Sequence, residues 1–233
     1  MIRLCEGVYR LESGGFVNSY LLEGERDLTL VDAGPARRAE ALLAELKGNA
    51  FSLADVGRVV VTHAHGDHAG GLARLLALRP IKVYAHPAET AVLTGEAPVP
   101  SFRGALGFLL ETLSEQVLSW SPVDNVMPAQ PGTPVRGLPR WQILHTPGHT
   151  AGSLSLYEPV KQVLLCGDLL SNRGGRLHRV RDALDQDPAQ SGASVSRVAA
   201  MDVDILGCGH GPEVRGGAFR HIEGLVRGEP ASR

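Results

Sequence analysis

The segment Thr62–Gly71, with the sequence THAHGDHAGG, constrains the fold and the chemistry of this chain more than any other. It overlaps the end of the apolar run Val59–Thr62, which we interpret as a buried strand. Four potential metal ligands lie within six residues of the segment: His63, His65, Asp67 and His68. If the imidazoles were protonated, these side chains would repel one another, and if they were neutral, their proximity would add little stability. A cation lying among them would stabilise the cluster. Because Gly66 makes a tight turn sterically easy, the segment predicts a metal-binding loop at the end of a strand.

Cysteine usage narrows the chemistry of such a site. The 233-residue chain has nine histidines but three cysteines, Cys5, Cys166 and Cys208, with no C-x-x-C pair. A zinc site built on thiolates and a disulfide-stapled secreted scaffold are therefore both disfavoured. Any metal must be held by imidazole and carboxylate groups, which suit zinc, iron or manganese.

The order of predicted elements indicates an α/β fold. Hydrophobic residues make up 43% of the chain and charged residues 21%, as in globular domains that are long enough to bury a core. Short apolar runs alternate with stretches of helical periodicity, which argues for a sheet covered by helices. We expect strands at Phe16–Leu22, Leu28–Val31, Val59–Thr62, Ile81–Ala85, Gln142–Leu144, Ser153–Tyr157, Val163–Leu165 and Val203–Leu206, and helices at Ala36–Lys47, Ala69–Leu78, Pro188–Met201 and Gly217–Arg227.

The stretch from about residue 95 to residue 140 interrupts this alternation. It holds seven of the fifteen prolines, clustered at its two ends around one segment with helical spacing. Since about 20 helical residues cannot bury a core of their own, we predict a single domain over residues 1–233 with a helical, proline-rich insertion at about 95–140. The insertion would form a lid whose Phe102, Phe108 and Trp120 suit an acyl chain or a lactone tail. An ordinary packing helix with long loops is the alternative.

Four further short motifs follow predicted strands and complete a recognisable pattern. They are VDAG with Asp32, TPGHT with His149, CGDLL with Asp168 and GCGHG with His210. Together with THAHGDHAGG, this pattern resembles the H-x-H-x-D-H signature and the later motifs of the metallo-β-lactamase-fold superfamily, over roughly residues 18–211. The resemblance implies a four-layer αβ/βα sandwich.

The resemblance also implies a binuclear metal centre. His63, His65 and His149 would hold the first divalent ion, Asp67, His68 and His210 the second, and Asp168 would bridge the two. Two such ions activate a shared water or hydroxide, and we expect zinc, with iron or manganese as alternatives. Asp67 is the candidate catalytic residue, because it would orient the nucleophile or move a proton. Asp32 would orient the metal loop by hydrogen bonds.

Among the branches of this superfamily, the chain most resembles the glyoxalase II-like hydrolases. It carries the full ligand set, and Gly175–Arg176 lies at an offset similar to a Gly-Lys or Gly-Arg pair that helps to hold the glutathione carboxylate in glyoxalase II. Arg176 would therefore grip an anionic group, unless it is a solvated turn residue. The chain departs from glyoxalase II in having only 23 residues after His210, where that enzyme has an extended helical region. We expect a hydrolase of a thioester, a lactone or a related small acyl compound.

Three other functions stay open. A persulfide dioxygenase of the same superfamily would use one iron, and a phosphodiesterase or nuclease would use two metals. A net charge of −2 argues against nucleic acid as the partner, although Arg173, Arg176, Arg179 and Arg181 form a local basic cluster. A non-catalytic metal-binding module ranks lowest because every expected ligand is present.

The remaining features predict simple roles. We expect His86 and His145 to be structural or to support the ligands, His178 and His221 to lie at the surface, and Cys166 and Cys208 to fill space at strand ends. No secretion signal or membrane span is visible, so we predict a cytoplasmic protein with no membrane partner. The oligomeric state is left open.

Overall fold

The computed structural model describes residues 1–99, 121–180 and 182–228, which form two β-sheets lying face to face with helices outside both. The first sheet has seven strands in sequential order: β1 (Ile2–Cys5), β2 (Val8–Leu11), β3 (Ser19–Glu23), β4 (Leu28–Val31), β5 (Val56–Val60), β6 (Lys82–Ala85) and β7 (Val126–Pro128). Strands β1 to β4 pair antiparallel, and β4 to β7 pair parallel.

The second sheet is built from the C-terminal half of the chain. Its order is β15 (Val214–Arg215), β14 (Ile205–Gly207), β11 (Val163–Leu165), β10 (Leu154–Glu158), β9 (Leu138–His145) and β8 (Pro134–Val135). Strands β11 and β14 are parallel, and the other neighbours are antiparallel. A separate hairpin joins β12 (Leu170–Arg173) to β13 (Arg176–Arg179).

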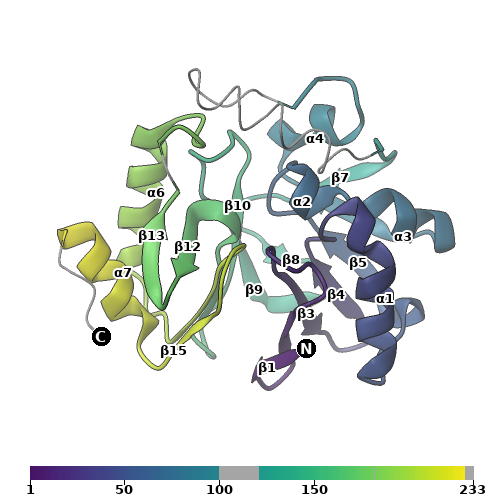
Figure 1. Cartoon of the computed structure of the whole chain (residues 1–233), viewed down its shortest axis with the longest axis horizontal. Coiled ribbons are helices and arrows are strands. Elements are labelled where there is room, and N and C mark those ends of the chain that lie inside the picture. The colour runs from purple at the N-terminus through teal and green to yellow at the C-terminus, as the bar shows by residue number, and fades with distance from the viewer. Residues whose placement is uncertain (100–120, 181, 229–233) are drawn as a thin grey trace.

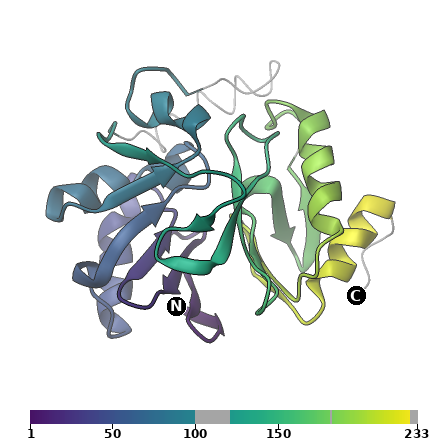
Figure 2. The same ribbon diagram turned by 180° about the vertical axis from the view of Figure 1, so that it is seen from behind.

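Helices cover the outer face of each sheet (Figures 1 and 2). The helices that follow strands of the first sheet are η1 (Ala36–Arg38), α1 (Ala39–Gly48), η2 (Leu53–Asp55), α2 (Gly66–Ala69), α3 (Leu72–Leu78) and α4 (Pro87–Leu93). Those that follow strands of the second sheet and the hairpin are η3 (Gly167–Leu169), α6 (Pro188–Ala199) and α7 (Ala218–Arg227). No described helix is long and apolar enough to cross a membrane.

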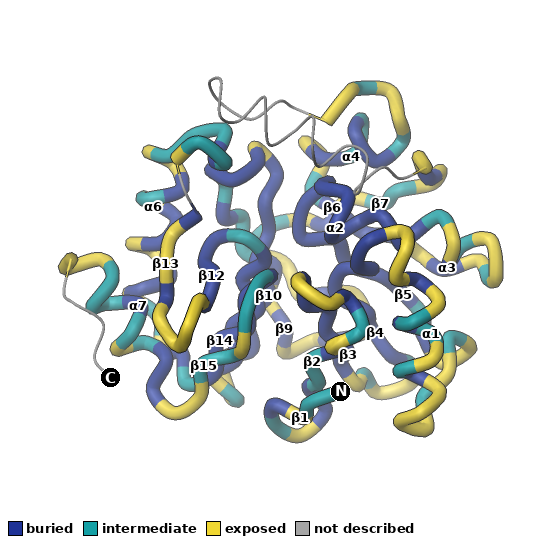
Figure 3. The backbone as a smooth tube through the Cα atoms, viewed as in Figure 1, coloured by how far each residue is buried: buried dark blue, intermediate teal, exposed yellow. Residues whose placement is uncertain are grey.

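Three apolar cores separate the four layers. Leu30 and Val59 face α1 and α3, whereas the next residues, Val31 and Val60, face the other sheet. This alternation follows from the two-residue period of a strand and explains why these strands read as continuous apolar runs. The third core lies under α6 and α7, and Figure 3 shows the buried strands between helices with exposed outer faces. The predicted α/β class and its four-layer sandwich are confirmed.

The structure adds elements that the sequence patterns did not predict. Strands β1, β2, β7 and β8, the β12–β13 hairpin and helix α4 are all new, and the strand expected at Phe16–Leu22 begins at Ser19. These strands are short or lie at sheet edges, where hydrophobic alternation is weak. Part of the expected insertion at about 95–140 lies outside the described residues, including Phe102, Phe108 and Trp120. Its described part supplies β7 and β8, which are edge strands of the two sheets.

Candidate metal centre

The seven predicted ligands come from loops that meet along one edge of the two sheets. His63 and His65 follow β5, and Asp67 and His68 lie on α2 directly after them. From the second sheet, His149 lies between β9 and β10, Asp168 in η3 after β11, and His210 after β14. The structure therefore brings together residues from both halves of the chain. Their ligand atoms form groups that lie within 4.8 Å of one another: the first triad, His63, His65 and His149; the second triad, Asp67, His68 and His210; and a connecting group, His63, His68 and Asp168.

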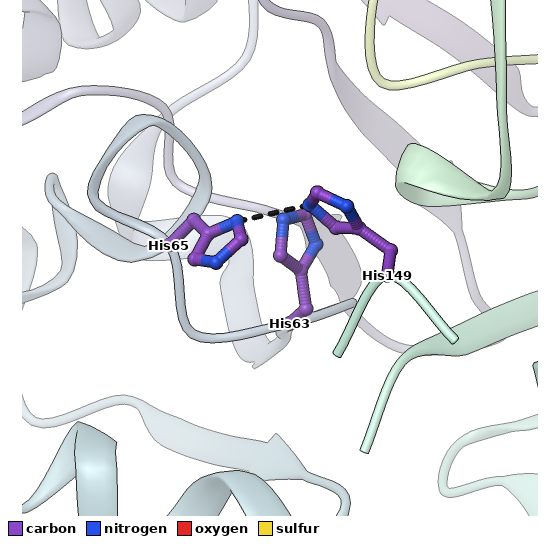
Figure 4. Close-up of side chains that lie close together, drawn as sticks. All are labelled: His63, His65 and His149. Carbon is purple, nitrogen blue, oxygen red and sulfur yellow. Dashed lines mark hydrogen bonds between the residues drawn. The ribbon is translucent and has the colours of Figure 1, made fainter. Parts of the chain in front are cut away.

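The first triad consists of three buried imidazoles (Figure 4). Nε2 of His149 lies 3.0 Å from Nδ1 of His65, and the ring centroids of His63 lie 4.6 Å and 4.8 Å from those of His65 and His149. Burial, reinforced by the neighbouring histidines, holds the pKa values of His63 and His65 well below their usual range. Both rings are therefore neutral, which is the protonation state that binds a metal.

The two histidines of the second triad lie close to two carboxylates, Asp67 of the same triad and Asp168. Nε2 of His68 is 3.9 Å from Oδ2 of Asp67 and 3.3 Å from Oδ1 of Asp168, and Nε2 of His210 is 3.5 Å and 3.2 Å from Oδ2 of the same two aspartates. Burial alone would lower the pKa of His210, but Asp168 raises it to about 9, and the pKa of His68 is likewise raised well above its usual range. The negative potential that favours protons on these rings equally favours a divalent cation in their place.

Asp168 connects the two triads. Its Oδ2 lies 3.7 Å from Nε2 of His149 as well as 3.2 Å from Nε2 of His210. Burial acts to raise the pKa of Asp168, but His210 and His68 outweigh it and hold that pKa well below its usual range. Asp168 is therefore ionised, and its carboxylate faces ligands of both triads.

In four of these histidines the Nδ1 atom faces a polar neighbour outside the cluster, so the Nε2 atom points into the cluster. The neighbours of Nδ1 are Thr62 Oγ1 for His63 (3.1 Å), Asp32 Oδ2 for His68 (2.8 Å), the Phe16 carbonyl oxygen for His210 (2.8 Å) and Asp185 Oδ1 for His149 (3.4 Å). Because the Thr62 hydroxyl donates to Asp32, it accepts from Nδ1 of His63 and leaves Nε2 of that ring as the basic nitrogen. This buried Nε2 has no hydrogen-bond partner among the described residues, as expected of a metal ligand. The donor set thus fits divalent cations bound by imidazole and carboxylate.

Asp32 lies behind the second triad. Its Oδ1 accepts the backbone N–H of Thr62 (2.7 Å), and its Oδ2 accepts the Thr62 hydroxyl (2.8 Å) and faces His68. The residue is 2% exposed and has a φ of 59°, a left-handed conformation that Asp tolerates better than most residues. These contacts suit the orienting role expected for Asp32.

Two buried carboxylates near the first triad were missed by sequence reasoning. Asp185, 1% exposed, faces His149, and Glu89, 4% exposed, accepts backbone N–H groups from the loops of both His65 and His149. Asp185 lies in the polar stretch RDALDQDP and Glu89 on a helix that was not predicted. No local pattern distinguishes such residues from surface carboxylates, because their burial arises from tertiary packing.

None of the other predicted residues belongs to the three ligand groups found in the described parts of the chain. Arg176 is exposed at the turn of the β12–β13 hairpin, and no hydrogen bond or ion pair within residues 1–99, 121–180 and 182–228 joins it to the seven ligands. His86 and His145 stack on each other with centroids 4.3 Å apart. His178 is exposed and His221 half-buried, whereas Cys166 and Cys208 are buried in the core under α6 and α7.

The two-sheet sandwich with its histidine- and aspartate-rich cluster at the sheet edge matches a known family. Residues 13–210 match the family described as the metallo-beta-lactamase superfamily. The chain belongs to this superfamily.

Individual relatives agree with this assignment. The chain is 27% identical over 210 residues to "Probable metallo-hydrolase YflN" of Bacillus subtilis (strain 168), a match that covers 82% of this chain and 78% of that protein. It is 33% identical over 186 residues to the hydroxyacylglutathione hydrolase of Cupriavidus taiwanensis, covering 78% of this chain and 58% of that enzyme. The match thus extends over little more than half of the second relative.

Solved structures show the same fold. The metallo-beta-lactamase family protein TTHA1429 from Thermus thermophilus superposes with a TM-score of 0.73 at 23% identity, covering 97% of this chain and 80% of that one. TTHA1623, solved in a di-iron-bound form, superposes with a TM-score of 0.69 at 26% identity, covering 92% and 94%.

Proposed function

We propose that this protein binds two divalent metal ions, zinc in the first instance, and hydrolyses a thioester, a lactone or a related small acyl compound. The observation that supports it most is the convergence of two ligand triads on one carboxylate, Asp168. His63, His65 and His149 would hold the first ion, Asp67, His68 and His210 the second, and Asp168 would contact both. When bound, such a pair of ions supplies a nucleophile at neutral pH and polarises the acyl oxygen.

The residues of the chain would prepare the site for this chemistry. The neutral imidazoles of His63 and His65 offer lone pairs without first losing a proton, because burial keeps their pKa values low. Asp32 fixes the ring of His68, so its Nε2 faces Asp67 and Asp168. Asp67 is 9% exposed, and its Oδ2 lies within 3.9 Å of His68 and 3.5 Å of His210. We propose that Asp67 orients the attacking group and accepts its proton.

The choice of an acyl substrate rests on the relatives. Hydroxyacylglutathione hydrolases are among the proteins most similar to this chain, and their name describes cleavage of a glutathione thioester. Because this chain spans only 58% of the Cupriavidus taiwanensis enzyme, we propose the acyl class and leave the glutathione part open. Arg176 remains a candidate contact for an anionic substituent.

Metal quantification joined to a substrate panel tests this function. Protein purified without chelators should contain two metal ions per chain and should hydrolyse at least one of a set of neutral and anionic thioesters and lactones. Asp168→Ala should lose metal and reduce turnover by about 100-fold or more, because both triads lose their shared carboxylate. Near-wild-type turnover at full metal content in that variant would contradict the assignment of the site.

The same experiment separates the other functions. One iron per chain with consumption of oxygen would indicate a dioxygenase instead, and cleavage of phosphodiesters without acyl hydrolysis would indicate a nuclease. Binding of metal without turnover of any substrate would favour a non-catalytic module.

A further inference from the structure

Glu89 is a buried carboxylate that joins two loops of the candidate metal centre. It lies in the first turn of α4 and is 4% exposed. Its Oε2 accepts the backbone N–H of Ala64 at 2.9 Å, and its Oε1 accepts the backbone N–H of Gly152 at 2.8 Å. The two carboxylate oxygens of Glu89 thus accept hydrogen bonds from two different loops.

Both loops belong to the first triad. Ala64 stands between His63 and His65, and Gly152 follows His149 by three residues. The first loop follows a strand of the first sheet, and the second connects β9 and β10 of the second sheet. Figure 4 shows the three imidazoles approaching one another from these two loops. Glu89 therefore spans the junction across which the first triad has to assemble.

The second loop packs closely against the side chain of Glu89. A Cβ atom at Gly152 would lie 2.6 Å from Cγ and Oε1 of Glu89, so this loop can approach the carboxylate so closely because residue 152 is glycine. Within the described parts of the chain, Glu89 forms no ion pair with a lysine or an arginine. A carboxylate that is buried without a paired side-chain cation depends on its hydrogen bonds, which here come from the N–H groups of Ala64 and Gly152.

The electrostatics of the first triad give Glu89 a second role. The first triad has no carboxylate of its own and shares Asp168 with the second triad, which also contains Asp67. The Glu89 carboxylate accepts the N–H of Ala64, between His63 and His65, so it places a second negative group beside the first triad.

We infer that Glu89 is a positioning residue that holds the His63–His65 loop and the His149 loop at the separation needed to bind the first metal ion. This inference rests on the proposed function, since it assumes that the first triad binds a metal. Glu89 does not contact the ion itself; it acts through the backbones that carry the ligands. Its removal should therefore weaken the first metal site and leave the second nearly intact.

The substitution Glu89→Gln tests the inference, because glutamine keeps the size of the side chain but offers one oxygen where two N–H groups need acceptors. The amide NH₂ would face the other N–H group, so one of the two loops is released. In a competition titration with Zn²⁺ and a chromophoric chelator, we expect one of two binding steps to weaken by about 10- to 100-fold and the other to change by less than about threefold. Turnover should recover when Zn²⁺ is raised above the weakened dissociation constant.

Two further variants guard against a trivial loss of folding. Glu158→Gln is the matched control, since Glu158 is 1% exposed and also accepts a backbone N–H, from Lys161, but lies at the end of β10 away from the cluster. It should leave both Zn²⁺ steps unchanged. Gly152→Ala pushes the Glu89 carboxylate aside without altering its charge, and it should weaken the same single step as Glu89→Gln.

The outcomes separate this inference from the proposed function. If wild-type protein binds two Zn²⁺ ions and hydrolyses a substrate but Glu89→Gln and Gly152→Ala bind both ions normally, Glu89 is only structural and the inference is wrong while the proposed function stands. Equal weakening of both steps also overturns it. If wild-type protein binds no divalent metal, the proposed function and the inference fail together.

Discussion

Asp32 combines an unusual backbone conformation with a charge that faces a candidate ligand. Its φ of 59° is left-handed, and its two oxygens accept the N–H and hydroxyl of Thr62 while facing Nδ1 of His68. Asparagine adopts such a φ more easily than alanine, for which it carries an energetic cost even though Ala50 also has a φ of 62°. Substitution at this one position can therefore separate the effect of charge from that of backbone strain.

We predict that Asp32→Asn folds normally but binds metal at the second triad about 10- to 100-fold more weakly, because His68 loses its anionic partner. Asp32→Ala should add a loss of stability of about 1 kcal/mol from the strained φ. Zn²⁺ titration and urea unfolding of the metal-free proteins measure the two effects. Equal unfolding stability of the two variants would contradict the backbone part of this prediction.

Helix α6 shows how a whole element supports one ligand loop. Asp187 caps this helix by accepting the N–H groups of Ala189 and Gln190, both at 3.0 Å, and its own N–H donates to the carbonyl of Gly148, next to His149. Ser194, farther along α6, donates its hydroxyl to the carbonyl of Pro147. The start of α6 and the loop that carries His149 are therefore held together.

We predict that Asp187→Ala lowers the free energy of unfolding by about 1 kcal/mol, since the first turn of α6 loses its side-chain acceptor. Asp187→Asn is the control, because asparagine caps helices about equally well. Urea unfolding of both variants distinguishes them. If the two variants lose the same stability, the cap is not the origin of the effect.

At the scale of the whole molecule, the two sheets are also joined by a pair of histidines outside the cluster. His86 follows β6 of the first sheet, and His145 ends β9 of the second. Their rings stack at 4.3 Å with an interplanar angle of 7°. Burial, then the proximity of His145, lowers the pKa of His86, so the folded protein resists protonation of this ring.

The lowered pKa of His86 makes the folded protein less stable at acidic pH. Below the usual pKa of 6.5 the unfolded chain binds a proton at His86 more readily than the folded chain does, so the free energy of unfolding falls as the pH decreases through this range. We predict that His86→Asn, which can still cap α4, reduces this fall between about pH 7.5 and pH 5.5. Urea unfolding of metal-free protein at the two pH values measures it, with His178→Asn on the exposed side of β13 as the control. An unchanged pH dependence in His86→Asn would show that this ring does not contribute.

Features that depend on neighbouring residues could be predicted from the sequence. The THAHGDHAGG motif and the Gly-containing motifs after later strands carry the ligand residues as short local patterns, and the strands buried on both faces, such as Leu28–Val31, are continuous apolar runs. Edge strands such as β8, with two residues, carry too little pattern to be recognised. Arg176 lies exposed in the β12–β13 hairpin, and its contact with an anionic group stays a prediction.

By itself, then, the sequence determined the donor chemistry, imidazole and carboxylate without thiolate, and the α/β class of the fold. Only the tertiary structure decided that Glu89 and Asp185 are buried carboxylates behind the histidines, and that α6 supports the His149 loop. The reason is physical. A ligand type is a property of one side chain, whereas the burial of a carboxylate and its hydrogen bonds depend on which distant loops the packed sheets bring together.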